Sequence, residues 1–282
     1  PENPNYDPER AARYGRAIHD FWVEQDRALG EVLAAVPEEA CTFLLSDHGF
    51  GPLRYDLRLR PFLLSPASGL TREEADGIYV LDRGDAARIY IARRGRDPGA
   101  PWPPSEALRV REKLARALRG VRDPRTGVAV CEAVWTNEEI FSGTYAEKGP
   151  DLVVLPAYGY FLIWGDQEPD PREPYIAPHA AHLSGWHRMN GIYAARGPGI
   201  APGRRDGEEG RLYSLVDVTP TLLYLLGEPI PEGLDGLPMR GMIDPGVLER
   251  RPPESAPALE EDIREMTPQE LQNLRNLPYI GG

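Results

Sequence analysis

Two short segments of the sequence carry residues whose types and spacing could bind a metal ion. Asp47 and His48 directly follow an apolar run, residues 41–45, that is typical of a strand buried on both faces. His187 comes shortly before a second apolar run, residues 192–195. Ligand sites in open α/β sheets lie beyond the carboxyl ends of the strands, and zinc and manganese accept carboxylate and imidazole ligands. The spacing therefore predicts a metal site at such an edge.

Asp47 and His48 can reach one ion only if the strand ends before them, because neighbouring residues of a regular strand point to opposite faces. Gly49 is expected to allow the chain to turn there, since glycine adopts backbone conformations that other residues avoid. Cys41, inside the first apolar run, is expected to be buried as a small hydrophobe.

Three motifs, taken in their order along the chain, resemble a known family. They are Ser46 to Phe50, Ser184 to Ile200 and Leu215 to Gly227. Together they resemble the alkaline phosphatase superfamily, and within it the type I phosphodiesterase/nucleotide pyrophosphatase group. Weaker similarity runs through most of the chain to residues 274–282. The resemblance implies an α/β fold: the C-terminal portion of the core of an alkaline-phosphatase-like α/β/α sandwich, with an inserted α+β cap region.

The resemblance also implies two divalent metal ions, with Zn or Mn expected. Asp47 and His48 would bind one ion together with an upstream Asp and a Thr or Ser nucleophile, and His187 would bind the other with a separate upstream Asp and His. His182 is expected to contact the substrate. The nucleophile is expected upstream of residue 1, so no catalytic residue is predicted within this chain. Three residues of this chain carry a hydroxyl that could in principle act as the nucleophile: Ser46, Ser184 and Thr219. Nothing in the sequence places any of them next to a base or a metal ion, which nucleophilic catalysis requires.

The activity implied by the resemblance is metal-dependent hydrolysis of phosphate esters, with phosphodiesters or nucleotide-like compounds as expected substrates. The expected partners are a small anionic phosphate ester and the N-terminal part of the same protein, because Pro1 stands where a complete chain would start with Met. The segment alone is expected to be inactive. Two alternatives stay open: a sulfatase or phosphonate hydrolase of the same superfamily, and a non-catalytic binding module that lacks half of the site.

Composition limits the class of protein. The 282 residues are 41% hydrophobic and 27% charged, which excludes a disordered or membrane-embedded chain, and no apolar run approaches the roughly 20 residues of a membrane span. The net charge of −12 disfavours a nucleic-acid surface but allows an anionic substrate, because bound dications reverse the local field. Two cysteines are too few for a disulfide framework, and a cytoplasmic location is expected.

Hydrophobic periodicity and turn residues predict the elements that position these residues. A long helix is expected over 9–36, an irregular stretch to residue 70, a hairpin of 77–81 with 87–92 around a turn at 83–85, and an exposed loop over 165–178. The other predicted elements are a helix from 103 to 120 with Leu108, Leu114 and Leu118 on one side, strands at 128–135 and 149–156, a helix from Thr221 ending at Gly227, and an amphipathic helix within 258–276. The predicted division is core 1–51, cap 52–176, core 177–245 and tail 246–282.

Several polar and aromatic residues have both a functional and a structural interpretation. His19, Asp20 and Asp26 are expected on a solvated helix surface, and Asp151 is expected to hold a turn at the start of a strand. The aromatic stretch 158–164 is expected to pack in the core, with a wall against the substrate as the alternative. Arg188 could pair with a phosphate or with a carboxylate, because its fork geometry suits both.

Overall fold

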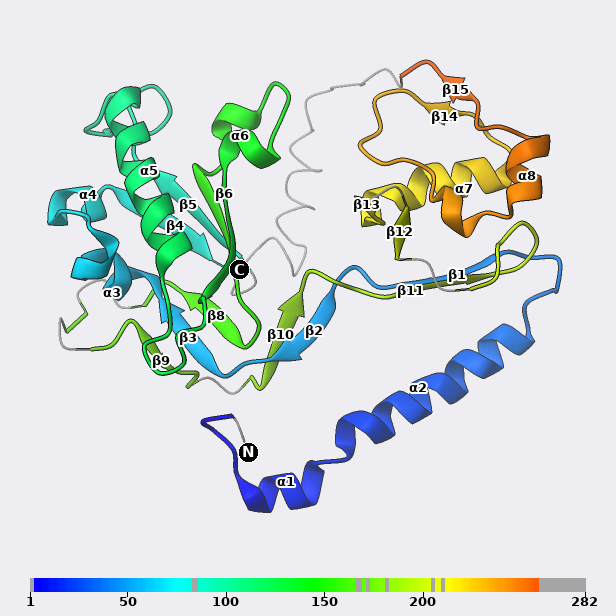
Figure 1. Ribbon diagram of the computed structural model, residues 1–282, viewed down its shortest axis with the longest axis horizontal. Coiled ribbons are helices and arrows are strands. Elements are labelled where there is room, and N and C mark those ends of the chain that lie inside the picture. The colour runs from blue at the N-terminus through cyan, green and yellow to red at the C-terminus, as the bar shows by residue number, and fades with distance from the viewer. Residues whose placement is uncertain are drawn as a thin grey trace, which may run out of the picture. The chain divides into compact units, whose positions relative to one another are not determined.

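The computed structural model divides the chain into two compact units. One comprises Pro1–Ala35 and Leu45–Tyr193, and the other comprises Val36–Leu44 and Ala194–Gly282. The residues described are 3–82, 86–165, 169–170, 173–180, 183–203, 206–208 and 211–258. Helices and strands alternate in both units, so the predicted α/β class is confirmed (Figure 1).

The larger unit contains most of the regular structure. Its helices are α1 (Pro8–Tyr14), α2 (Ala17–Ala34), α3 (Leu59–Leu64), α4 (Arg72–Asp76), α5 (Pro104–Gly120) and α6 (Asn137–Ile140). Its strands are β2 (Gly49–Pro52), β3 (Tyr55–Arg58), β4 (Ile78–Asp82), β5 (Ala87–Ile91), β6 (Cys131–Thr136), β7 (Leu152–Pro156), β8 (Tyr160–Ile163), β9 (Ile176–Pro178) and β10 (Gly185–Arg188).

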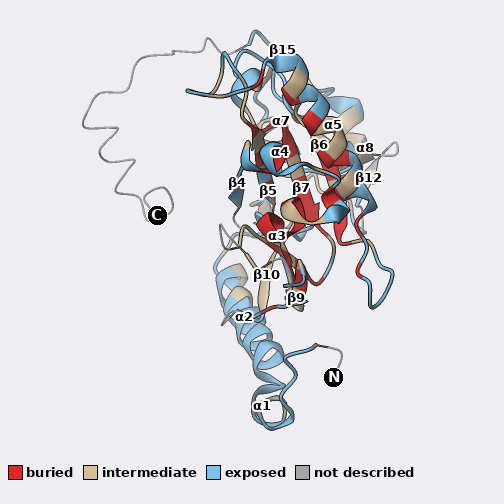
Figure 2. Ribbon diagram, turned by 90° about the vertical axis from the view of Figure 1, so that its left-hand side faces the viewer, coloured by how far each residue is buried: buried red, intermediate tan, exposed pale blue. Residues whose placement is uncertain are grey.

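An antiparallel sheet in the order β4-β5-β7-β6 carries the main core. Ala87, Ile89 and Ile91 of β5 are fully buried, while Arg88 and Tyr90 between them are not. This alternation is typical of a sheet with one face against a core. Leu114 and Leu118 of α5 are buried in the same cluster. Figure 2 shows this burial as red concentrated on α3, β5, β6 and β7.

The hairpin and α5 were predicted correctly. β4 pairs with β5 from Ile78 opposite Ile91 to Asp82 opposite Ala87, while the predicted turn at 83–85 lies outside the described residues. The prediction that Leu108 lies on the buried side of α5 is wrong, because Ala107 and Val110 occupy that side and Leu108 is exposed.

A second sheet, in the order β8-β3-β9, fills stretches that were expected to be irregular or exposed. β3 pairs in parallel with β8, and antiparallel with β9, which places Leu57 opposite both Leu162 and Ile176. All three of these side chains are buried. The prediction of an irregular stretch to residue 70 is therefore wrong, and so is the exposed loop over 165–178, because β9 lies within it. Strands of three or four residues give too short a pattern to recognise.

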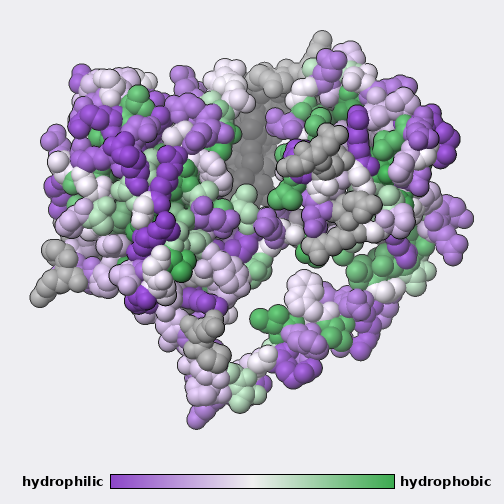
Figure 3. Space-filling model, viewed as in Figure 1, coloured by the Kyte–Doolittle hydropathy of each residue, from purple (hydrophilic) through white to green (hydrophobic). Residues whose placement is uncertain are grey.

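The predicted helix over 9–36 is confirmed with one break. α1 ends at Tyr14 and α2 begins at Ala17, with Gly15 closing α1 through a hydrogen bond from its N–H to the Ala11 carbonyl. No residue of either helix is buried, as Figure 2 shows in pale blue. Apolar side chains such as Phe21 and Trp22 are therefore exposed beside polar ones, and green and purple surfaces alternate over this segment in Figure 3.

A buried carboxylate ties the loop after α5 to β8. Asp123 accepts hydrogen bonds from the Tyr160 hydroxyl at 2.6 Å and from the Arg125 backbone N–H at 2.9 Å, and it pairs with the Arg125 guanidinium. The same guanidinium lies 3.5 Å over the Tyr55 ring. Burial would raise the pKa of Asp123, but the hydrogen bonds from Arg125 and Tyr160 outweigh it and lower the pKa to about 2.

Asp123 is expected to make the folded protein sensitive to acid. A lowered pKa means that the carboxylate stabilises the fold above its usual value of 3.8 and loses this contribution as the pH falls towards about 2. The contribution is on the order of 2 kcal/mol. Urea unfolding of the full-length protein between these pH values should show a shallower loss of stability in Asp123→Asn than in the unchanged protein. Equal slopes would contradict this role.

Within the described residues, the smaller unit contains short strands and two α-helices. They are β1 (Thr42–Leu45), β11 (Tyr193–Arg196), β12 (Gly207–Glu208), β13 (Arg211–Leu212), α7 (Val218–Leu226), β14 (Ile230–Pro231), α8 (Pro245–Arg250) and β15 (Ser255–Ala256). α7 ends at Gly227, whose φ of 86° is the left-handed conformation of a helix C-terminus, as predicted. The Asp217 carboxylate accepts hydrogen bonds from the backbone N–H groups of Ser214 and Leu237.

β1 differs from the predicted core strand. It pairs with β11 alone in a two-stranded sheet, its residues are half-buried or exposed, and Cys41 is exposed. The prediction of a strand buried on both faces is therefore wrong in this structure, because a two-stranded sheet cannot cover its own faces. The predicted helix within 258–276 lies outside the described residues, apart from Ala258. No helix in the described part of the chain is long and apolar enough to cross a bilayer.

Candidate metal site

Asp47 and His48 lie in the short irregular segment between β1 and β2. β1 ends at Leu45 and β2 begins at Gly49, so the strand ends before the two residues, as their convergence requires. Asp47 Oδ1 lies 3.5 Å from His48 Nε2. The Asp47 side chain is 80% exposed and the His48 side chain 35%, so both are open to an ion and its other ligands.

The backbone fixes which nitrogen of His48 can bind a metal. His48 Nδ1 lies 2.9 Å from the Gly49 carbonyl oxygen. A carbonyl oxygen only accepts, so Nδ1 donates, and in the neutral imidazole the lone pair is then on Nε2. A hydrogen bond of this kind commonly orients a metal-binding imidazole. The nitrogen available to a metal is thus the one beside the Asp47 carboxylate.

His187 is brought to this segment by strand pairing. β10 pairs antiparallel with β2, which places His187 opposite Phe50 and Arg188 opposite Gly49. The His187 ring stacks on the His48 ring with a centroid distance of 3.9 Å and an interplanar angle of 29°. The three residues predicted as metal ligands therefore lie together, although 139 positions separate the two histidines in the sequence.

Two glycines allow the backbones to approach closely here. A Cβ atom on Gly49 would lie 2.0 Å from the Asn190 carbonyl oxygen, and one on Gly191 would lie 2.4 Å from Ser46 Oγ. Gly49 is thus required by close approach of the chain, and it is not among the glycines with positive φ, so the predicted turn is not its reason. Ser46 Oγ accepts a hydrogen bond from the Ile192 N–H at 2.8 Å, which gives this hydroxyl a structural role.

Aromatic side chains pack against the His187 ring. Trp186 stacks on His187 at 4.8 Å and 17°, and Phe161 meets Trp186 edge to face at 5.6 Å. Within the aromatic stretch 158–164, Tyr160 and Leu162 are buried as predicted, whereas Tyr158 is exposed. Phe161 packs against the Trp186 ring that stacks on His187. Arg188 donates to the carbonyl oxygens of Pro52 and Tyr160, at 3.4 and 3.3 Å, and its guanidinium lies 5.6 Å over the Tyr158 ring. These described contacts include no carboxylate.

A buried pair of a histidine and a carboxylate lies close to this cluster, and sequence reasoning did not find the pairing. His179 Nδ1 donates to Asp56 Oδ1 at 2.6 Å, and both residues are buried. Burial raises the pKa of Asp56, and the hydrogen bond from His179 offsets only part of that effect. His179 Nε2 is buried without a hydrogen-bond partner among the described residues, while its ring meets Phe161 at 5.3 Å. No sequence signal could pair two residues 123 positions apart.

The three predicted ligands fit a divalent cation in chemistry but do not complete a ligand set. A carboxylate and two imidazoles, one with an oriented lone pair, are ligands that zinc and manganese accept. Among the residues described, no group of three or more His, Cys, Asp or Glu is arranged to hold a metal ion. His182 lies outside the described residues. His19 and Asp20 form an exposed pair on α2 instead, as expected for a helix surface.

Comparison with known proteins gives one family and several distant structures. The family model of type I phosphodiesterase / nucleotide pyrophosphatase matches residues 3–188, which include all three predicted ligands. No curated protein matches the sequence. Human ectonucleotide pyrophosphatase/phosphodiesterase 5 is 13% identical with a TM-score of 0.32, over 71% of this chain and 42% of that one. The murine protein, including an inactive variant in complex with AMP, is 16% identical with a TM-score of 0.30, over 57% and 34%.

The chain spans less than half of the length of these solved structures. The match to the family model covers well over half of the chain itself and includes the strands that bring His48 and His187 together. It agrees with the resemblance to the alkaline phosphatase superfamily that the sequence motifs indicate. The chain belongs to the type I phosphodiesterase/nucleotide pyrophosphatase family.

Proposed function

We propose that the whole protein is a metal-dependent hydrolase of phosphate esters, with phosphodiesters or nucleotide-like compounds as substrates. The observation that carries the proposal is the meeting of Asp47, His48 and His187 at one place, inside the segment that matches the family. Family membership supports the class of reaction. The chosen substrates within this class are part of the proposal.

Two divalent ions, zinc or manganese, would be held in part by this chain: one by Asp47 with His48, and the other by His187. When bound, such ions neutralise the charge that develops on the phosphoryl group. The chain's own residues then have distinct tasks. The Gly49 carbonyl accepts from His48 Nδ1 and orients the ring with Nε2 towards Asp47, and Trp186 covers one face of the His187 ring. Asp47 supplies a charged oxygen beside His48 Nε2.

The remaining ligands and the Thr or Ser nucleophile are proposed to come from an N-terminal part of the same protein. The incomplete ligand set of the described residues supports this, because no three of them are arranged around one ion. On this proposal the present segment alone is inactive. The free thiols of Cys41 and Cys131 are compatible with the reducing cytoplasm that we propose as its location.

A panel of substrates tests the reaction class. The full-length protein, supplied with zinc or manganese, is expected to hydrolyse nucleotide diesters faster than phosphate monoesters, sulfate esters or phosphonates, as measured by kcat/KM for each. A preference for a sulfate ester or a phosphonate would overturn the choice of diesters and favour another branch of the superfamily. Binding of these compounds without turnover of any of them would favour a non-catalytic module.

A further inference from the structure

A pocket of about 680 Å³ lies beside the loop that follows β5, away from the residues of the candidate metal site. Its volume is in the range of sites that take small molecules. None of the three predicted metal ligands lines it. The polar lining residues are Tyr79, Tyr90, Arg93, Arg94, Arg96, Asp97, Glu147 and Lys148.

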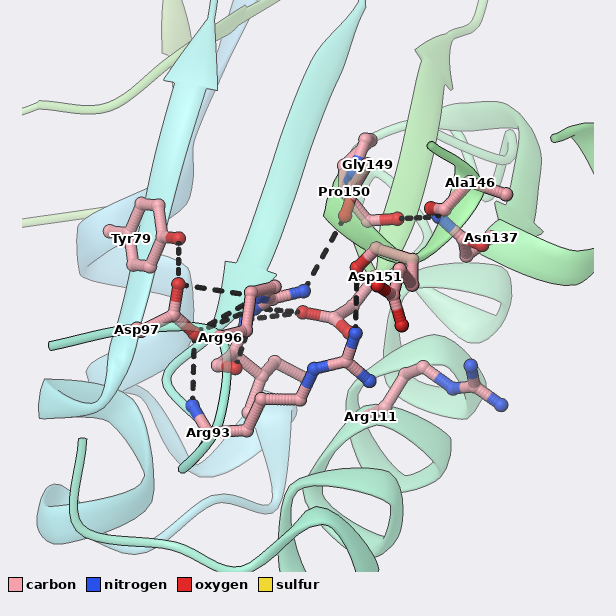
Figure 4. Close-up of polar contacts among 12 residues, drawn as sticks. Tyr79, Arg93, Arg96, Asp97, Arg111, Asn137, Ala146, Gly149, Pro150 and Asp151 are labelled. Atoms are coloured by element: carbon pink, nitrogen blue, oxygen red, sulfur yellow. Dashed lines mark hydrogen bonds and ion pairs between the residues drawn. The ribbon is translucent and has the colours of Figure 1, made fainter. Parts of the chain in front are cut away.

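The wall of this pocket is held in place by a hydrogen-bonded ion-pair network (Figure 4). Asp97 accepts from the Arg93 N–H at 3.0 Å and from the Tyr79 hydroxyl at 2.8 Å. Arg96 pairs with Asp97 at 3.0 Å and with Asp151 at 2.8 Å, and donates to the Ile91 carbonyl at 2.9 Å. Asp151 also accepts from the Ile91 N–H at 2.7 Å, so its role is structural, but its side chain contacts the end of β5 rather than the predicted turn. These bonds hold the loop that follows β5 in place without a ligand.

Two nearby carboxylates, buried Asp151 and half-buried Asp97, both pair with the Arg96 guanidinium. Burial alone would lower the pKa of Arg96, but its pairs with Asp151 and Asp97 raise it, so the guanidinium stays charged. Neither carboxylate is left to neutralise the other cations of the pocket. Arg96 therefore holds the pocket wall in place, and the positive charge available to a ligand comes from the other cations of the lining.

Three cations of the lining form no ion pair with a carboxylate in the described part of the chain. Arg93 donates to the Glu147 carbonyl at 2.8 Å, and Arg94 donates through Nε to the Pro101 carbonyl at 3.2 Å. Lys148 Nζ lies 5.0 Å over the Tyr145 ring. Other arginines of the same unit, such as Arg58 and Arg111, are paired with glutamates. The lining also carries the carboxylates of Asp97 and Glu147, so four cations face two anions. The local charge is therefore positive in a chain of net charge −12, which favours an anion.

An aromatic wall adjoins the cations. The rings of Tyr79 and Tyr90, paired across β4 and β5, stack at 4.9 Å and 4°. Tyr79 is 40% exposed, so part of its ring is open to a ligand. Two guanidinium groups and an ammonium carry three positive charges, which favours a doubly charged phosphate over a singly charged carboxylate, although arginine forks bind the oxygens of both.

We propose that this pocket binds the phosphate group of a small molecule, either inorganic phosphate or a phosphate monoester, through Arg93, Arg94 and Lys148. The site does not depend on the metal ions of the proposed reaction. It is a second anion site in the larger unit, with its frame supplied by Arg96, Asp97 and Asp151.

Calorimetric titration of inorganic phosphate into the full-length protein tests the proposal. The titration is made with a chelator present and in the His187→Ala background, so that the candidate metal site contributes no binding. Saturable binding of one phosphate per chain is expected. The exposed pair of substitutions Arg94→Gln and Lys148→Gln should weaken it by about tenfold or more, because charge-assisted hydrogen bonds are the strong ones. Unchanged affinity in that double variant, or no saturable binding at all, would overturn the site.

Arg116→Gln is the matched control, because Arg116 is an exposed residue of α5 without an ion pair in the described part of the chain. It removes one charge outside the pocket and should leave phosphate affinity unchanged; an equal loss there would show a general charge effect and contradict the site. A parallel titration with AMP distinguishes the sources: tighter binding than phosphate assigns a monoester that uses the Tyr79 ring, and equal binding assigns inorganic phosphate. Because no turnover is measured, failure of the proposed hydrolase activity leaves this result unaffected.

Discussion

Replacing His187 with alanine in the full-length protein is expected to lower metal-dependent kcat/KM by more than about 100-fold. Loss of groups that merely orient metal ligands costs about 10–100-fold, and loss of a ligand should cost at least as much. Asp47→Ala and His48→Ala should have effects of the same size, because their side chains lie at the same place and would hold the partner ion. Steady-state kinetics with a nucleotide diester measures all three.

His19→Ala is the matched control for these variants. His19 is an exposed histidine on α2 whose side chain is hydrogen-bonded to Arg16 and Asp20 in the described part of the chain. Its removal should leave kcat/KM unchanged, whereas each ligand variant should also bind less metal, as measured by elemental analysis of the same samples. Unchanged activity in Asp47→Ala, His48→Ala or His187→Ala would remove that residue from the proposed site.

Asp56→Ala is expected to lower the free energy of unfolding by about 3 kcal/mol. The substitution leaves the buried imidazole of His179 without its one hydrogen-bond partner at 2.6 Å, and loss of one member of a buried pair is strongly destabilising. Asn5 donates to the His179 carbonyl, so the loss should also loosen the N-terminal segment where it meets β9. Urea unfolding of the full-length protein measures the change.

Asp20→Ala supplies the comparison, because Asp20 also pairs with a histidine, His19 at 3.1 Å, but on an exposed helix surface. Its cost should stay below about 1 kcal/mol. A double-mutant cycle of Asp56→Ala with His179→Ala should give a coupling of about 0.5–3 kcal/mol. If Asp56→Ala costs no more than Asp20→Ala, the buried pair does not stabilise the fold as described.

Local patterns in the sequence were sufficient for several elements. The β4–β5 hairpin, α5 and the end of α7 at Gly227 follow from alternation, helical spacing and a glycine, all of which act within a few residues. The meeting of Asp47 and His48 also follows locally, because β1 ends before them.

Contacts between distant segments could not be predicted in the same way. β3 pairs in parallel with β8 about 100 residues later, and each strand has only four residues. The Asp56 and His179 pair arises from this sheet and therefore has no local signature. The residue types and the family resemblance predicted that His48 and His187 belong to one site, but the stacking of their rings comes from the register of β2 with β10 and was not predicted. The exposure of β1 likewise depends on how many strands surround it.

The most direct test of the proposed metal-dependent hydrolase is the mass and metal content of the protein produced from its complete gene. Mass spectrometry and elemental analysis are made on one sample. The proposal predicts a protein larger than this 282-residue segment that carries about two divalent ions per chain. A protein of the size of this segment with little bound metal would contradict it, and Asp47, His48 and His187 would then belong to a binding module instead.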